Sequence, residues 1–258
     1  MKLTTVFSAV NANPAYYKFI PKQILFWGKF NIRFVVVFIG KELPEELVPY
    51  KANIVLWTKN LDLNTAFVGQ NMRLYYPALI SLPEDELVMI TDMDMLPTND
   101  TYFTSGLESY TKKDFIYYRH IDHDQIYIMY NAAHPTTWST IFEIRSEADI
   151  EQRIYETYKS QYNGIPGSTG WFTDQEILYK RLIGYPHLQV LNRPIKRLEM
   201  NIYSERMRNR EASFIHLYDD CHFHRDFMGN RVRILDAERQ LLNKPADVTL
   251  PWNSVMRR

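Results

Sequence analysis

Two aspartates separated by one residue, Asp92 and Asp94, follow a largely apolar stretch at residues 87–91. Such a stretch is typical of a strand buried on both faces, and ligands of open α/β sheets bind outside the carboxyl ends of strands. Carboxylates this close repel each other, but a hard ion such as Mg²⁺ or Mn²⁺ accepts their oxygens and keeps positions for phosphates. The pattern predicts a metal and phosphate site. The alternative is a turn in which one aspartate caps the next segment and the other is solvated.

The span 67–97 resembles the corresponding part of GT-A glycosyltransferases, especially the glycogenin-like and galactosyltransferase-like enzymes of family 8. Those enzymes have a helix with an arginine and a Tyr/Leu-Pro pair, followed by a strand that ends in an Asp-x-Asp motif. Here these features are Arg73, Tyr76-Pro77 and residues 92–94. The resemblance implies that Asp92 and Asp94 contact Mn²⁺, that Asp92 and Met93 contact the donor nucleotide, and that Arg73 contacts the donor phosphate or sugar. Without it, a surface salt bridge is the simpler interpretation of Arg73.

A second acidic candidate is Asp174, which stands beside Gln175 at the start of a predicted helix over residues 173–183. We expect Thr173 to cap this helix, with Glu176 in the capping-box position. A carboxylate in the first turn is favoured by the helix dipole and is available to a substrate hydroxyl. By the resemblance, Asp174 is the general base if the reaction inverts the anomeric centre, whereas Asp174 and Gln175 position the sugar if it retains. Ordinary charge complementarity at a helix start is the alternative.

The resemblance also implies donor contacts at two further places. The end of the first strand, at Ala9, Val10 and Asn11, should lie by the nucleotide base. Asn131, which follows a predicted strand, should lie near the donor sugar, and its amide offers both a donor and an acceptor to hydroxyls. An Asx-turn that closes the strand is an equally good interpretation of Asn131.

Residues 213–218 are expected to form an apolar strand that delivers His216, and the resemblance makes His216 the third protein ligand of the metal. The sequence then departs from the family, which continues with glycine and a Lys-Pro-Trp element that grips the diphosphate. Here His222, His224 and Arg225 are candidates for that role, and the sequence does not choose among them. A further polar cluster at residues 119–124 is interpreted as a loop near the donor or acceptor site.

Alternating strand-like and helix-like segments must position these groups. Asn13 and Pro14 form a helix-start signal, and the helix that follows should be interrupted at Pro21. We predict strands at 3–10, 32–39, 54–57, 87–91, 115–118 and 126–130, and helices at 15–30, 64–80, 148–158 and 173–183. This alternation indicates an α/β fold of the Rossmann-like GT-A type, with a mixed, mostly parallel sheet flanked by helices. We expect one domain, with residues 1–100 binding the nucleotide sugar and residues 101–258 binding the acceptor.

Composition limits the possible partners. Thirty basic and thirty acidic residues cancel over the 258 residues, so no global field attracts nucleic acid or an anionic membrane. Cys221 is the single cysteine, which excludes an intrachain disulfide. No apolar run is long enough to span a bilayer, and residues 1–10 are interpreted as a strand rather than a signal peptide. The sequence thus predicts a soluble, cytoplasmic protein.

Together these features predict a Mn²⁺- or Mg²⁺-dependent glycosyltransferase that moves a sugar from a nucleotide-diphosphate donor to a hydroxyl of a glycan or glycoprotein. The alternative from another class is a non-catalytic nucleotide- or carbohydrate-binding protein on the same fold. A phosphatase of the haloacid-dehalogenase type also carries Asp-x-Asp after a buried strand. It expects that motif near the N-terminus and a later Gly-Asp-x-x-x-Asp, which this sequence lacks.

Overall fold

The computed structural model describes residues 1–119, 125–158, 160–165, 167–199, 205, 214–223 and 227–243. Most of the polar cluster at 119–124, together with His224 and Arg225, lies outside these residues. The described strands form a seven-stranded sheet in the order β3-β2-β1-β4-β7-β6-β8 and a three-stranded sheet in the order β5-β10-β9. They are β1 (Lys2–Asn11), β2 (Arg33–Ile39), β3 (Ile54–Trp57), β4 (Glu86–Ile90), β5 (Met95–Pro97), β6 (Phe115–Tyr117), β7 (Asn131–Ala133), β8 (Leu188–Val190), β9 (Arg197–Glu199) and β10 (Asp220–His222).

The large sheet is mixed and mostly parallel, as predicted. Strands β1, β2, β3 and β4 pair in parallel, and so do β6 and β8, whereas β7 runs antiparallel to both β4 and β6. The carboxyl ends of β1 and β4 therefore meet at one edge of the sheet. This is the edge at which an α/β sheet holds its ligands.

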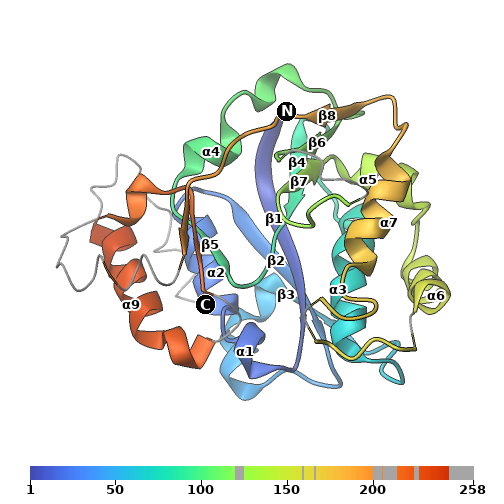
Figure 1. Ribbon diagram of the computed structural model, residues 1–258, viewed down its shortest axis with the longest axis horizontal. Coiled ribbons are helices and arrows are strands. Elements are labelled where there is room, and N and C mark those ends of the chain that lie inside the picture. Colours follow the sequence, from blue (N-terminus) through green and yellow to red (C-terminus); the bar gives the residue numbers. More distant parts are fainter. Residues whose placement is uncertain are drawn as a thin grey trace.

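Helices cover both faces of the sheet (Figure 1). Helices α3, α5 and α7 lie on one side of β1, and α2 and α9 lie on the other. The helices are α1 (Pro14–Tyr17), α2 (Ile20–Gly28), α3 (Thr65–Tyr75), α4 (Asp100–Thr104), α5 (Pro135–Phe142), α6 (Glu147–Thr157), α7 (Thr173–Leu182) and α9 (Phe227–Asn243), with the 3-10 helices η1 (Glu45–Asn53), η2 (Tyr76–Leu79), η3 (Leu107–Ser109) and η4 (Ile215–Leu217). None of the helices in the described part of the chain has the length and apolarity to cross a membrane.

The apolar run of β2 illustrates why the strands are so hydrophobic. Val36 and Phe38 belong to one core cluster, and Val35 and Val37 belong to a second cluster on the opposite face. Because side chains alternate between the two faces of a strand, a sheet covered on both sides needs apolar residues at every position. The sequence prediction of a strand covered on both faces is confirmed.

Local signals predicted the start of the chain well. Asn13 caps α1 by accepting a hydrogen bond from the backbone of Ala15 at 3.0 Å, and Pro14 occupies the first helical position. The helix expected over 15–30 is interrupted as predicted, because α1 ends at Tyr17 and Pro21 lies in the first turn of α2. Proline lacks the backbone N–H that an uninterrupted helix would use there.

Three local predictions are wrong. Residues 126–130 do not form a strand, since Tyr130 adopts a left-handed backbone with φ 62° and pairing begins only at Asn131. The described part of 213–218 holds the 3-10 helix η4, and the strand follows it as β10. Thr173 is the first residue of α7, with Phe172 at the cap, because the Thr173 hydroxyl donates back to the Gly170 carbonyl. The first two errors arise where a turn competes with an extended segment, and the third is a shift of one residue at the start of a helix.

Candidate functional site

The Asp-x-Asp segment joins β4 of the large sheet to β5 of the small one. The backbone N–H of Thr91 donates to the Phe7 carbonyl at 3.0 Å, which extends the pairing between β4 and β1 by one residue. The Ser8 hydroxyl donates to the Thr91 carbonyl at 2.8 Å. These contacts fix the point at which the chain leaves the sheet, so Asp92 and Asp94 are held at its carboxyl edge.

A buried amide on α2 holds the other side of this segment. The Gln23 Nε2 donates to the carbonyl oxygens of Met93 at 2.8 Å and Met95 at 2.9 Å. The Trp27 Nε1 donates to Gln23 Oε1 at 2.9 Å, which fixes the orientation of the amide. Gln23 was not predicted as a functional residue, although a polar residue on the apolar side of a predicted amphipathic helix was a usable signal.

Asp94 faces an imidazole rather than a second carboxylate. Its Oδ2 lies 3.7 Å from His222 Nε2, and the His222 Nδ1 lies 3.2 Å from Glu199 Oε2. The antiparallel pairing of β10 with β5, which sets His222 opposite Met95, creates this arrangement. Burial opposes a charged imidazolium, but hydrogen bonding to Asp94 and the charges of Asp94 and Glu199 raise the pKa of His222 above its usual range.

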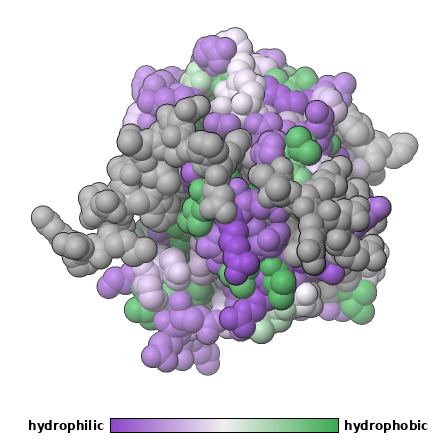
Figure 2. Space-filling model, turned by 90° about the vertical axis from the view of Figure 1, so that its left-hand side faces the viewer, coloured by the Kyte–Doolittle hydropathy of each residue, from purple (hydrophilic) through white to green (hydrophobic). Residues whose placement is uncertain are grey.

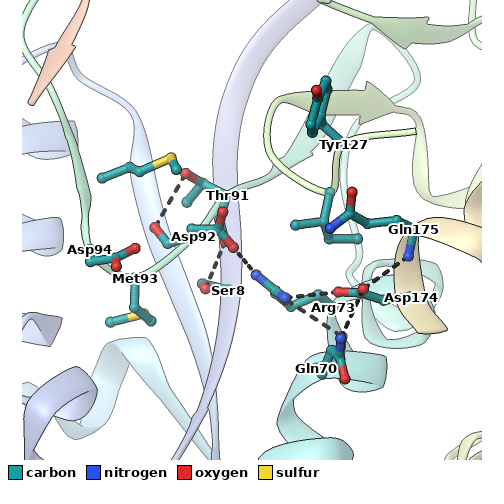
Figure 3. Close-up of polar contacts among 12 residues, drawn as sticks. Ser8, Gln70, Arg73, Thr91, Asp92, Met93, Asp94, Tyr127, Asp174 and Gln175 are labelled. Atoms are coloured by element: carbon teal, nitrogen blue, oxygen red, sulfur yellow. Dashed lines mark hydrogen bonds and ion pairs between the residues drawn. The ribbon is translucent and has the colours of Figure 1, made fainter. Parts of the chain in front are cut away.

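Arg73 links the Asp-x-Asp segment to the second acidic candidate. One guanidinium nitrogen pairs with Asp92 Oδ1, and the Nη2 lies 2.9 Å from Asp174 Oδ2. Figure 3 shows that Arg73 approaches Asp92 from the side of Asp174, whereas Asp94 lies on the opposite side. The arginine therefore does not occupy the space between Asp92 and Asp94. The interpretation of Arg73 as an isolated surface salt bridge does not hold, because its side chain is only 14% exposed and pairs twice.

Asp174 is enclosed by hydrogen-bond donors. Only 1% of its side chain is exposed, and its Oδ1 accepts from Gln70 Nε2 at 3.0 Å and from the Gln175 backbone at 2.9 Å. Burial raises the pKa of Asp174 to about 6, and the nearby Arg73 guanidinium limits that rise. Three donors, Arg73, Gln70 and the Gln175 backbone, orient the carboxyl and favour its ionised form.

These groups line one cleft with a volume of about 580 Å³, within the range of small-molecule sites. Asp92, Asp94, His222, Arg73 and Asp174 lie on it. Polar side chains from α1 and the start of α3 line it as well, and a segment after α6 contributes aromatic and amide groups. The remaining lining residues that matter for a ligand are Ala9, Val10, Asn11, Asn13, Tyr16, Asn64, Gln70, Met93, Tyr162, Asn163, Trp171 and Gln175.

Two predicted site residues are not brought to the cleft. His216 lies exposed in η4 and is not among the lining residues, because β10 places the histidine six positions later beside Asp94. Asn131 is fully buried, and its Nδ2 donates to the carbonyl oxygens of Tyr127 and Ile128 at 2.8 Å each. Asn131 thus closes the turn before β7, and Ile128 in that turn reaches the cleft.

The cleft contains acceptor atoms that have no protein partner. The Oε1 atoms of Gln70 and Gln175 are buried and unpaired in the described structure, and both residues line the cleft. A buried carbonyl oxygen without a partner costs free energy comparable to a lost hydrogen bond. Ligand hydroxyl groups would satisfy such atoms.

The protein groups alone do not complete a metal site. Among the described residues, no three His, Cys, Asp or Glu side chains converge closely enough to hold an ion. Asp94 and His222 lie 3.7 Å apart, and Asp92, two residues earlier in the chain, lines the same cleft. Mg²⁺ and related ions are commonly bound by one or two carboxylates plus the phosphates of a substrate. The donor set therefore fits an ion that is bound together with a diphosphate.

No family model matches this sequence, and neither does any curated protein. Among solved structures, the glycosyltransferase GlyE of Streptococcus pneumoniae TIGR4 is 13% identical with a TM-score of 0.47, over 92% of this chain and 60% of GlyE. The galactosyltransferase LgtC, solved with donor and acceptor sugar analogues, is 11% identical with a TM-score of 0.49, over 98% of this chain and 100% of LgtC. A glycosyltransferase involved in glycosylation of the major capsid of PBCV-1 is 10% identical with a TM-score of 0.47, over 92% of this chain and 100% of the other.

All three structures are glycosyltransferases, the class that the sequence resembled. The chain spans only 60% of the length of GlyE. Likenesses this distant assign no substrate and no residue role to this chain. Its chemistry has to be inferred from the groups in its own cleft.

Proposed function

We propose that this chain transfers a glycosyl group from a nucleoside-diphosphate sugar to a hydroxyl acceptor, with Mn²⁺ or Mg²⁺ holding the diphosphate. The observation that carries the proposal is that one cleft combines a carboxylate and imidazole wall, Asp92, Asp94 and His222, with the buried pair Arg73 and Asp174. A protein that only binds sugar needs groups that form hydrogen bonds with the sugar hydroxyls. It gains little from an acidic wall suited to a cation and a diphosphate.

We assign the metal to Asp92, Asp94 and His222, with His222 in place of His216. Glu199 beside Nδ1 leaves Nε2 directed toward Asp94, the arrangement that commonly orients a ligating imidazole. Bound there, the metal would neutralise negative charge on the departing diphosphate. Among the described residues, no three such side chains converge without the donor, so the phosphates of the donor would complete the coordination.

We assign the nucleoside to the part of the cleft formed by residues 9–11, with Asn13, Tyr16 and Asn64. These side chains are uncharged, which suits a base and a ribose rather than a phosphate. Amide groups supply both donors and acceptors, and the Tyr16 ring offers a flat apolar surface. The nucleoside would then lie at the end of β1, one strand away from the Asp-x-Asp segment.

We assign the donor sugar to the region of Arg73, Asp174 and Gln175. The free acceptor atoms of Gln70 and Gln175 would receive hydrogen bonds from sugar hydroxyls. Asp174 already accepts from Arg73, Gln70 and the backbone of Gln175, so three of its roughly four lone-pair sites are engaged. This favours Asp174 as a group that fixes Arg73 and balances positive charge at the sugar, over Asp174 as a general base.

Calorimetric titration of the wild-type chain with a panel of nucleoside diphosphates, with and without Mn²⁺, tests the binding part of the proposal. Wild type should bind at least one diphosphate, and Mn²⁺ should strengthen that binding. Asp94→Asn should weaken the Mn²⁺-dependent part about ten-fold or more while the thermal melt stays intact. Asp85→Asn, which removes an aspartate whose side chain is 67% exposed and away from the cleft, is the matched control.

Release of nucleoside diphosphate from a panel of nucleotide sugars then separates an enzyme from a binding protein. The proposal predicts Mn²⁺-dependent hydrolysis or transfer that is lost in Asp94→Asn. Binding without turnover across the panel would leave a non-catalytic nucleotide-binding protein. Failure to bind any nucleoside diphosphate with either metal would overturn the proposal as a whole.

A further inference from the structure

The C-terminal helix α9 (Phe227–Asn243) has one face packed against the protein. Ile234, Ala237 and Leu241 are no more than 2% exposed, and the helix contacts α1, α2 and η4. Asn230 Nδ2 donates to the Phe223 carbonyl at 2.6 Å, and Gln240 Oε1 accepts from the backbone of Phe214 at 2.9 Å. These contacts fix the rotation of the helix about its axis, and so determine which residues face outward.

The outward face is apolar. Met228 is 53% exposed, Val232 72%, Leu235 38% and Leu242 48%. Their spacing of four, three and seven residues places them on one side of the helix. Figure 2 views the side of the molecule on which α9 lies in Figure 1, and hydrophobic groups reach the surface there among hydrophilic ones. Single exposed aliphatic side chains are ordinary, but four aligned on one helix indicate a contact surface.

The charges around these side chains are of one sign. Arg231 and Arg239 are exposed and, by helical periodicity, lie on the same side as Val232 and Leu235. The two carboxylates of α9 are half-buried at the flanks of this face: Glu238 pairs with Lys22 on α2, and Asp236 accepts from the buried Gln240. Within the described helix, the outward face therefore presents arginines and aliphatic groups without a carboxylate.

We propose that this face, formed by Met228, Arg231, Val232, Leu235, Arg239 and Leu242, binds the surface of an anionic membrane with α9 lying parallel to the bilayer. Helices of this kind bury aliphatic side chains at the boundary between head groups and acyl chains. Arginine side chains beside them reach the lipid phosphates, since their long stems keep the charge at the polar layer. The proposal does not depend on the proposed function.

The composition of the face favours lipid over a protein partner. It contains no aromatic residue, whereas protein interfaces are enriched in tyrosine, tryptophan and phenylalanine. The outside of a single helix is convex and offers no groove for a peptide. A second copy of the chain would bring Arg231 and Arg239 against the same arginines, which is unfavourable. The net charge of the whole chain is zero, so this local basic surface is not apparent from the overall composition.

Co-sedimentation of the full-length protein with vesicles tests the proposal. Vesicles of phosphatidylcholine with phosphatidylglycerol should bind the protein, vesicles of phosphatidylcholine alone should bind it much less, and added salt should weaken the binding. Each arginine near an anionic surface strengthens binding about five-fold, so Arg231→Gln with Arg239→Gln should weaken it about ten-fold or more. Val232→Ser with Leu235→Ser should also reduce it about ten-fold or more, through lost apolar contact.

Matched controls are available on the opposite side of the molecule. Val190 on β8 is 43% exposed, and Arg145 before α6 is exposed, so Val190→Ser and Arg145→Gln remove the same kinds of group away from α9. Both controls should bind vesicles like wild type.

Three results with vesicles would each overturn the proposal. They are equal binding to neutral and anionic vesicles, no binding to either kind, and α9 variants that bind as well as wild type. Light scattering that showed a dimer lost in Val232→Ser with Leu235→Ser would overturn it in favour of self-association.

Discussion

The guanidinium of Arg73 bridges Asp174, at 2.9 Å from its Oδ2, and Asp92 of the Asp-x-Asp segment. Asp92 follows β4 and Asp174 lies in α7, more than eighty positions away in the sequence. Arg73 is therefore the connection between the carboxylates expected to hold the metal and the carboxylate expected to act at the sugar. Its side chain is 14% exposed, so the connection is made largely out of water.

Replacement of Arg73 by Met should destabilise the fold and abolish turnover. Removing one partner of a buried ion pair leaves an uncompensated carboxylate, which typically costs about 3 kcal/mol of unfolding free energy. Urea unfolding measures that loss. Arg73→Lys should be more stable than Arg73→Met, because lysine keeps the positive charge. It should recover little of the turnover, because lysine lacks the forked guanidinium that contacts two carboxylates at once. Wild-type turnover in Arg73→Lys would contradict this role.

The free energy of unfolding should fall as the pH rises through the range in which Asp174 loses its proton. Its pKa is about 6 in the folded protein, against 3.8 for an unperturbed carboxyl, so the folded state holds the extra proton between these values. The contribution of Asp174 to the unfolding free energy is fully present below about pH 4 and is lost as the pH rises past 6. The change amounts to up to about 3 kcal/mol. The amide in Asp174→Asn does not titrate. The difference in unfolding free energy between wild type and Asp174→Asn should therefore change with pH in this direction, and a constant difference would exclude it.

The same variant tests the place of Asp174 in the reaction. Asp174→Asn should depress turnover far more than it weakens donor affinity, because the amide still fills the space but carries no charge toward Arg73. Initial rates and calorimetry separate the two quantities. Turnover that stays within a few-fold of wild type would show that Asp174 has no catalytic part.

His222 and His216 should differ sharply in metal dependence. His222→Ala should raise the Mn²⁺ concentration needed for half-maximal donor binding about ten-fold or more, because His222 lies 3.7 Å from Asp94. His216→Ala removes an exposed imidazole from η4 and should leave the Mn²⁺ requirement unchanged. Manganese titrations of donor binding give both values. The reverse result would return the metal ligand to His216.

Gln23 should matter for both stability and donor binding, although it does not line the cleft. Gln23→Met keeps the volume but leaves the Met93 and Met95 carbonyls and the Trp27 N–H without a partner. We expect a loss of about 1–3 kcal/mol in unfolding free energy together with weaker Mn²⁺-dependent binding. Gln152→Met on the exposed side of α6 is the control and should change neither. Normal Mn²⁺-dependent binding by Gln23→Met would show that the amide does not position the segment.

Much of the frame could be predicted because its signals are local. Buried parallel strands need apolar residues at consecutive positions, so β1, β2, β3 and β4 were located from the sequence. Asn13, Pro14 and Pro21 acted within one turn of where they stand, so the start and interruption of the first helix were also predicted. The carboxyl edge of the sheet followed from the strands, which made Asp92 and Asp94 identifiable.

The rest depended on contacts between distant residues. Whether His216 or His222 meets Asp94 is decided by the register of β10 against β5, a pairing of segments more than one hundred and twenty residues apart along the chain. The left-handed backbone at Tyr130, where the extended and turn conformations compete, decides whether Asn131 contacts a ligand or closes a turn. Sequence alone determined which residue types could bind a cation at the edge of a buried sheet, and its resemblance to a family pointed to Arg73. The tertiary structure decided that His222 lies beside Asp94 and that Arg73 pairs with both Asp92 and Asp174, because partners that far apart are selected only when the elements pack.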